Sequence, residues 1–157
     1  MDTLTDRPVA ASEEFLVSFE TLAQAVRRAR GASPLNRAAE LTLSQYSLLQ
    51  PLCDAETARV SDLAGDAGIA PSTATRILDA LERRELVHRA RSAEDRRGVT
   101  VTLTAAGRRT LRDQDGWMRA RKLTFYDQLP GEERELVSDL LVRLAALIDD
   151  LSAGPAD

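Results

Sequence analysis

The feature that most constrains the fold is a short helix, a tight turn and a second helix between residues 61 and 83. Ser61 can cap a short helix that ends at Gly68, a residue free to adopt positive φ. Pro71 then stands where the first residue of the next helix is expected. The inward stripe of that helix has spacing i, i+3, i+4, i+7 and consists of Ala74, Ile77, Leu78 and Leu81. This arrangement predicts a helix-turn-helix.

After Leu86 the apolar period changes from helical to alternating. Val99, Val101 and Leu103 alternate with threonines, which predicts a half-buried strand. Its expected partner is 87–91, with an arginine-rich loop between the two strands. A β-hairpin that directly follows a helix-turn-helix is a wing. We therefore predict a mainly α fold with a small β-wing: a winged helix-turn-helix with flanking dimerisation helices.

The flanking segments carry helical patterns of their own. A first helix is predicted from residue 12 to 29, and Gly31 ends it. Thr42 and Gln45 form a capping box for a second helix, and Pro51 should kink or end that helix near Gln50. Thr104 can cap a later helix, which breaks at 129–131 before a final helix. Their apolar stripes are Phe15, Phe19, Leu22, Val26 and Ala29; Leu111, Met118 and Phe125; and Val137, Leu140, Leu141, Leu144, Ile148 and Leu151.

Helices this long cannot all bury their apolar faces within one small subunit. We therefore expect the first and last helices to pair with those of a second copy. The predicted organisation is one domain over 1–157, with dimerisation helices at 12–40 and 105–151. A winged helix-turn-helix lobe at 42–104 is expected to bind DNA.

Composition excludes several classes of protein. The chain has 43% hydrophobic and 29% charged residues, no apolar run long enough for a membrane span, and an acidic N-terminus unlike a signal peptide. We expect a cytoplasmic protein. Cys53 and His88 are the only residues of their types, which excludes an intramolecular disulfide and the common zinc constellations. The usual catalytic and phosphate-loop motifs are missing too, so we expect neither an enzyme nor a bound cofactor or metal.

The net charge of −4 is unevenly distributed along the chain. Residues 59–112 carry 11 arginines against 7 acidic residues, a net +4, whereas the remainder carries 10 basic and 18 acidic residues. Phosphate contacts depend on local positive charge, so a basic middle segment is compatible with DNA binding.

Three stretches carry a resemblance to a known family: LTLSQYSLL, RVSDLAGDAGIAPSTATRILDALERRELVHR and AEDRRGVTVTLTAAGR. Together they are similar to the multiple antibiotic resistance regulator (MarR) family, and Asp95 with Arg97 matches its Asp-x-Arg wing signature. The resemblance implies a homodimer that binds double-stranded DNA with an inverted-repeat operator. It further implies a repressor that a small amphipathic or aromatic effector releases.

The predicted DNA contacts lie on the second helix and the wing. Ser72 and Thr73 stand at a helix N-terminus, which suits phosphates or base edges, and Arg76 is long enough to reach a guanine. The alternative is that the two hydroxyls only cap the helix while Arg76 pairs with Asp79. In the wing, Arg97 can pair with Asp95 and leave Arg96 to enter the minor groove, or Arg97 itself can enter it. The alternative is a solvated charged turn without a DNA contact. The full predicted set is Pro71, Ser72, Thr73, Thr75, Arg76, Arg91, Asp95, Arg96 and Arg97.

Two positions depart from the family pattern. Glu85 stands where the family commonly has glycine, so the turn into the wing is expected to differ. Pro51 alters the helix that borders the family's ligand pocket. Possible lining residues of such a pocket are Phe15, Phe19, Tyr46, Leu49, Trp117 and Met118, although core positions explain them equally well.

Two other functions remain open on sequence grounds. One is a winged-helix module that binds only proteins, which predicts no retention on DNA. The other is a redox sensor based on Cys53, although a lone cysteine is more often a small buried hydrophobe. His88 is expected to be a strand residue that faces solvent or DNA.

Overall fold

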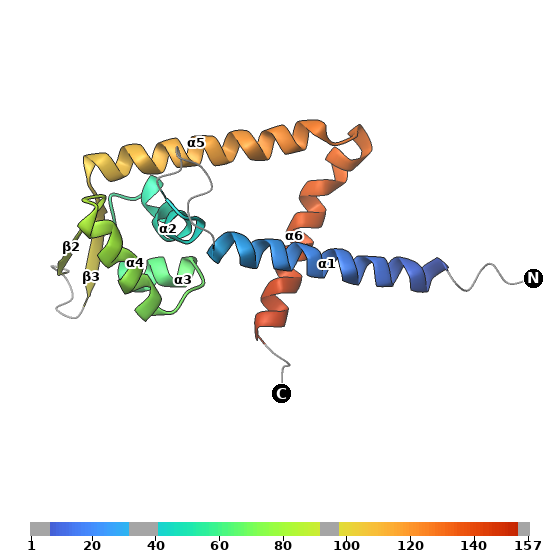
Figure 1. Cartoon of the computed structure of the whole chain (residues 1–157), viewed down its shortest axis with the longest axis horizontal. Helices are drawn as coiled ribbons and strands as arrows, with labels where there is room; N and C mark the ends of the chain where they lie inside the picture. Colours follow the sequence, from blue (N-terminus) through green and yellow to red (C-terminus); the bar gives the residue numbers. More distant parts are fainter. Residues whose placement is uncertain (1–6, 32–40, 92–97, 154–157) are drawn as a thin grey trace, which may run out of the picture. The chain divides into compact units, whose positions relative to one another are not determined.

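The computed structural model describes residues 7–31, 41–91 and 98–153. Figure 1 shows a mainly helical chain with a small sheet, which confirms the predicted fold class. The chain divides into two compact units, one through Asp115 and one from Gly116 onward. The elements are α1 (Arg7–Gly31), α2 (Leu43–Leu49), the 3-10 helix η1 (Gln50–Cys53), β1 (Thr57–Arg59), α3 (Val60–Asp66), α4 (Pro71–Arg83), β2 (Val87–Arg91), β3 (Val99–Leu103), α5 (Ala105–Gln128) and α6 (Gly131–Ala153).

The strands form a three-stranded antiparallel sheet in the order β1-β3-β2. The predicted wing hairpin is confirmed, with Val87 opposite Leu103 and Arg91 opposite Val99. Strand β1 was missed because three residues are too short to display an alternating pattern. It pairs with β3 through Ala58 opposite Val101, so the wing hairpin is joined to the segment that leads into α3.

One hydrophobic core holds the winged lobe together. It collects apolar side chains from the helices, the sheet and the first turns of α5, and burial of such groups is the main stabilising term in folding. Val99 was expected to face inward but is 40% exposed, because it lies at the outer end of the hairpin. The buried residues include Leu41, Tyr46, Leu48, Leu49, Leu52, Leu63, Ala74, Leu78, Leu81, Leu86, Val87, Val101, Leu103 and Leu111.

Local signals explain most helix ends in the lobe. The capping box of Thr42 and Gln45 is present, and Pro51 lies in the first turn of the 3-10 helix that follows α2. Gly68 has φ 62° and Pro71 is the first residue of α4, as predicted. The cap assigned to Ser61 is wrong. Helix α3 already begins at Val60, because β1 leads directly into it.

The end of α4 has the hydrogen bonds of a Schellman motif. The Leu86 N–H donates to the Leu81 carbonyl at 3.0 Å, and the Glu85 N–H donates to the Glu82 carbonyl at 2.9 Å. Glu85 takes the left-handed conformation with φ 57°, a position that glycine normally fills. The expectation of a different turn is therefore wrong: the turn forms without glycine, at a conformational cost.

The start of α5 packs closely on this turn. As predicted, Thr104 caps the helix, since its Oγ1 accepts from the Gly107 N–H at 3.0 Å. The same hydroxyl donates to the Glu85 carbonyl at 2.7 Å. A Cβ on Gly107 would lie 1.9 Å from the Leu86 carbonyl oxygen, so only glycine fits at this contact.

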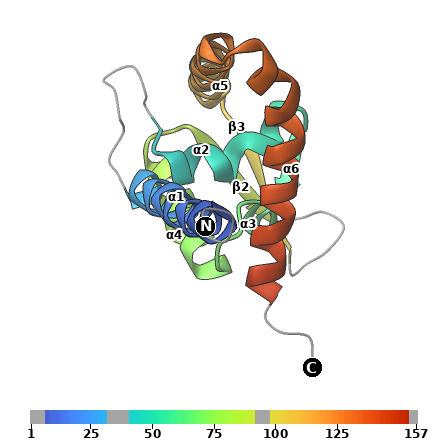
Figure 2. The same ribbon diagram turned by 90° about the vertical axis from the view of Figure 1, so that its right-hand side faces the viewer.

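The terminal helices differ from the lobe in leaving apolar side chains exposed. Helix α1 exposes Phe15, Leu16 and Val17 among others, and it has an aromatic contact between Phe15 and Phe19 with ring centroids 6.0 Å apart. Helix α6 has no buried residue. In the second unit, Arg134 donates to carbonyls at the end of α5 and closes the connection to α6 seen in Figure 2. No helix in the described part of the chain is long and apolar enough to cross a membrane.

Candidate DNA-binding site

Helix α4 presents its predicted contact residues on one face. Pro71, Ser72, Thr75 and Arg76 are exposed and Thr73 is half-buried, while the opposite face is in the core. The alternative that the hydroxyls at 72 and 73 cap the helix is wrong. The N-cap is Ala70, which has no side-chain hydrogen bond. The first turns of α4 therefore offer short polar side chains and a cation to a ligand.

Arg76 does not form an ion pair with Asp79, which was the alternative to a DNA contact. Asp79 instead accepts from Arg89 at 2.6 Å. Within residues 7–31, 41–91 and 98–153, no hydrogen bond or ion pair holds the Arg76 side chain. Its guanidinium is therefore available for an external acceptor, such as a guanine edge or a phosphate.

Arg89 joins α4 to the wing, a role that sequence reasoning missed. From β2, its guanidinium donates to Glu82 at 2.7 and 2.9 Å and to Asp79 at 2.6 Å. Its backbone N–H donates to Glu82 at 3.0 Å. These hydrogen bonds lower the pKa of Glu82 and raise that of Arg89. The pairing could have been suspected from opposite charges on an amphipathic helix and the adjacent strand.

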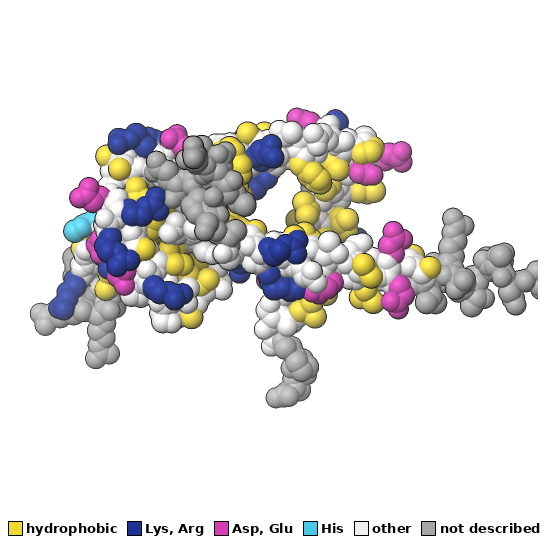
Figure 3. Space-filling model, viewed as in Figure 1, with side chains coloured by type: hydrophobic (Ala, Val, Ile, Leu, Met, Phe, Trp, Pro, Cys, Tyr) yellow, Lys and Arg dark blue, Asp and Glu magenta, His cyan; other side chains and the backbone are white. Residues whose placement is uncertain are grey.

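Of the four predicted wing residues, only Arg91 lies among the described residues. Arg91 is exposed at the end of β2, whereas Asp95, Arg96 and Arg97 lie outside the described residues. His88 is exposed on the same strand, as expected. A hollow of about 340 Å³ lies between the helices and the wing strands, and Thr75 and Val99 both line it. Figure 3 shows Lys and Arg side chains gathered over this lobe.

The six residues proposed as pocket lining fall into different settings. Tyr46 and Leu49 belong to the lobe core, and the Tyr46 hydroxyl donates to Asp115 at 2.7 Å. Burial, followed by this hydrogen bond, raises the pKa of Tyr46. Phe15 and Phe19 lie on α1, while Trp117 and Met118 are half-buried on α5 in the second unit. Their joint role stays a prediction.

Cys53 differs from its expected setting. It was expected to be buried, yet it is exposed at the end of η1, because the 3-10 turn after Pro51 directs it outward. Partial desolvation and then the nearby carboxylates Asp115 and Asp54 raise the pKa of its thiol. A raised pKa disfavours the thiolate that reacts with peroxides. Within the described ranges, no three His, Cys, Asp or Glu residues cluster as metal ligands.

The comparisons with known proteins decide the family. Residues 41–99 match the MarR family model. The regulator FarR of Neisseria gonorrhoeae is 30% identical over 120 residues, covering 76% of this chain and 82% of FarR. The uncharacterized regulator YxaD of Bacillus subtilis is 34% identical over 119 residues, covering 72% and 80%. Both are HTH-type transcriptional regulators. The chain belongs to the MarR family.

Solved structures agree with this assignment. The transcriptional repressor CouR, bound to a 23-mer DNA duplex, is 30% identical with a TM-score of 0.66, covering 82% of this chain and 89% of CouR. A MarR family transcription regulator at 17% identity has a TM-score of 0.77 over 94% of this chain and 98% of its own, which shows the shared fold. This chain is a DNA-binding MarR-family transcriptional regulator, as its resemblance implied.

Proposed function

We propose that this MarR-family regulator is a cytoplasmic homodimer that represses transcription from an inverted-repeat operator and is released by a small molecule. The observation that carries the proposal is the division of α4. One face is anchored in the core through Ala74, Leu78 and Leu81, while Ser72 and Arg76 are exposed at its beginning. A helix held rigidly on one side and polar on the other suits entry into a major groove.

The predicted contact residues have two kinds of role. Arg76 reads a base edge, with Pro71, Ser72, Thr73 and Thr75 placing the start of α4 against the backbone. Arg91, Arg96 and Arg97 contact the phosphates or the minor groove beside the wing, and Asp95 orients Arg97. The pair formed by Arg89 with Glu82 supports this division, because it ties the wing strand to α4.

Dimerisation explains the exposed apolar faces at the two ends of the chain. Helix α1 and helix α6 each expose large apolar side chains that a lone subunit leaves in contact with water. A two-fold pair of lobes would present two recognition helices roughly 34 Å apart, which matches half-sites separated by one turn of DNA.

Release is proposed to depend on a small amphipathic or aromatic effector. DNA binding by BpsR of Bordetella bronchiseptica, a solved structure similar to this chain, is regulated by 6-hydroxynicotinic acid. Here an effector would bind near Phe15, Phe19, Tyr46, Leu49, Trp117 and Met118. It would change the spacing of the lobes and lower operator affinity without dissociating the dimer.

The deciding experiment is binding to the intergenic DNA beside the protein's own gene, followed by fluorescence anisotropy at several salt concentrations. Arg76→Ala should reduce the preference for operator over scrambled DNA. Arg96→Ala should weaken binding to both and make the salt slope shallower by about one unit per lost phosphate contact. Arg109→Ala, an exposed arginine of α5 outside the predicted set, is the matched control.

Three results would each contradict a part of the proposal. No preference for any fragment of the intergenic DNA at low salt would favour a protein-interaction module. Equal losses for Arg76→Ala and Arg96→Ala, with the preference unchanged, would make Arg76 a backbone contact. Titration with an effector while oligomeric state is followed would test the release mechanism, since dissociation on release would refute it.

A further inference from the structure

The face of α4 that is turned away from the core carries an acidic residue among polar and basic ones. Steps of four, three and four residues place on this face Ser72, Arg76, Asp79 and Arg83. The buried stripe of the helix lies on the opposite side. In the proposed complex with DNA, Asp79 therefore lies between two arginines that face the phosphates. A carboxylate without a partner at this position would repel the DNA.

Asp79 is paired with Arg89, which reaches it from the neighbouring strand. The Arg89 guanidinium donates to Asp79 at 2.6 Å and to Glu82 at 2.7 and 2.9 Å. Figure 1 shows β2 beside α4, as these contacts require. Only 23% of the Arg89 side chain is exposed, against 48% for Asp79, so the guanidinium is the less hydrated partner. Loss of Arg89 would leave two carboxylates on α4 without their cation.

Two other cations lie within reach of Asp79. Arg76 precedes it by three residues and Arg83 follows it by four, and side chains at these spacings are neighbours on a helix. On α6, Asp139 and Arg143 do form an ion pair at the second of these spacings, with the oxygen and nitrogen 3.7 Å apart. An Asp79 carboxylate that lost its partner on β2 would therefore turn to the arginines of its own helix and withdraw them from DNA.

We propose that Arg89 is a positioning residue for DNA recognition, which neutralises Asp79 on the face of α4 that meets DNA and holds it away from Arg76. This inference rests on the proposed role of α4. Arg89 acts through Asp79 rather than by touching DNA, because its Nε and Nη2 groups are both engaged within the lobe. Tethering of the wing strand is a separate role, which Glu82 performs through its own hydrogen bonds to Arg89.

The test is a rescue experiment on the full-length protein, with binding to the operator measured by fluorescence anisotropy at fixed salt. Arg89→Gln should weaken binding by about tenfold, because Asp79 is left uncompensated near the phosphates. Addition of Asp79→Asn should restore the affinity to within about threefold of wild type. It should not restore the stability lost with Arg89, which urea denaturation of the same variants would measure. A purely structural role for Arg89 would not separate these two readouts.

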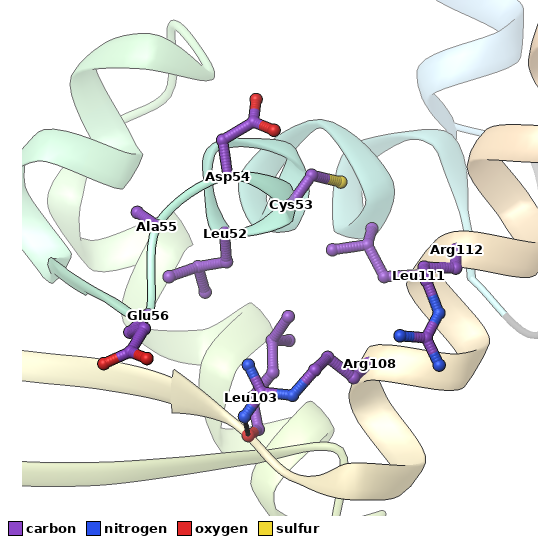
Figure 4. Close-up of a pocket in the computed structure, with 9 residues that line it drawn as sticks. All are labelled: Leu52, Cys53, Asp54, Ala55, Glu56, Leu103, Arg108, Leu111 and Arg112. Carbon is purple, nitrogen blue, oxygen red and sulfur yellow. Dashed lines mark hydrogen bonds between the residues drawn. The ribbon is translucent and has the colours of Figure 1, made fainter.

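Two controls distinguish this role from a tether and from net charge. Glu82→Gln should not weaken binding, because Asp79 still holds Arg89 and the amide oxygen can still accept a hydrogen bond. Arg89→Gln combined with Glu56→Gln has the same net charge as the rescued double variant, yet it should stay weak. Glu56 is exposed and lies outside α4 and the wing strands, at the edge of the group of side chains in Figure 4.

Three results would each overturn the proposal: no recovery of binding with Asp79→Asn, equal recovery with Glu56→Gln, or a loss in Glu82→Gln as large as that in Arg89→Gln. The role of α4 is tested separately by Arg76→Ala. If Arg76→Ala binds all DNA as wild type does, the proposed contact face is wrong. If Arg76→Ala weakens or relaxes binding while Arg89→Gln does not, only the role of Arg89 is refuted.

Discussion

The winged lobe and the final helix use apolar residues in opposite ways. In α4, three of 13 residues are fully buried, and the hydrogen bonds of its C-terminal turn are satisfied within the lobe. In α6, none of 23 residues is buried, and seven of its large apolar side chains are exposed. The lobe therefore holds its own structure, whereas α6 still has surface to bury. This contrast supports the proposed division between a DNA-binding lobe and terminal helices that dimerise.

The largest expected effect is on the contact between α5 and the turn after α4. Gly107→Ala would place a Cβ 1.9 Å from the Leu86 carbonyl, and backbone on both sides leaves little room to adjust. We expect a loss of about 3 kcal/mol or more in the free energy of unfolding, measured by urea denaturation.

Gly116→Ala is the matched control, because it lies on the same helix with nothing within 4 Å of the added Cβ. It should be neutral or stabilising by up to about 1 kcal/mol, since alanine favours helix. A loss at Gly107 no greater than the change at Gly116 would show that the start of α5 does not pack tightly on the turn after α4.

The next effect concerns α6 and tests the other half of the contrast. Leu140→Glu should weaken dimerisation by about 2 kcal/mol or more, because it places a charge in an interface that is proposed to be apolar. Analytical ultracentrifugation over a concentration series would measure this, while circular dichroism checks that the helices persist. Arg143→Ala is the control, since that side chain is highly exposed and polar. If Leu140→Glu dimerises over the same concentration range as the wild-type protein, α6 is not part of the dimer interface.

Much of the lobe could be predicted from sequence because its signals are local. The capping box at Thr42, the proline at position 71 and the alternation ending at Leu103 each define a boundary within a few residues. Strand β1 was missed because three residues carry no period. The exposure of Cys53 depends on how the 3-10 turn after Pro51 is placed, which no sequence period encodes.

The candidate site was harder to predict because its contacts cross between elements. Arg89 faces Glu82 and Asp79 only because β2 folds back beside α4, so charge alone could not decide which acid Arg89 would meet. Glu85 was misread for a related reason. The Schellman hydrogen bonds and the bond from Thr104 hold it in a conformation that its own preference disfavours.

A smaller effect follows from this strained position. Glu85→Gly should stabilise the protein by roughly 1 kcal/mol or less, because relief of the positive φ is partly offset by the greater freedom of glycine in the unfolded chain. Glu132→Gly, in the first turn of α6, is the comparison and should be destabilising. A stability loss at Glu85 would mean that its side chain contributes more to the turn than its backbone costs.

The smallest effect is a difference in pH dependence between two glutamates, one in the winged lobe and one on α1. Glu82 in the lobe and Glu20 on α1 both have a lowered pKa, chiefly because an arginine side chain donates a hydrogen bond to each. A carboxylate with a lowered pKa in the folded state adds stability above its ordinary value of 4.5, and that stability is lost as the pH falls through the lowered pKa. Glu82→Gln should therefore destabilise the lobe at pH 7 by about 0.5 kcal/mol, the range of a solvent-screened ion pair. The difference should shrink as the pH falls below 4.5. Glu20→Gln should leave unfolding of the lobe unchanged at every pH, because the partners of Glu20 among the described residues all lie on α1. Urea denaturation from pH 7 down to about pH 3, below the ordinary carboxyl pKa, would measure both. Identical pH profiles for the two variants would mean that Arg89 does not couple the wing strand to α4 more firmly than an exposed helical ion pair does.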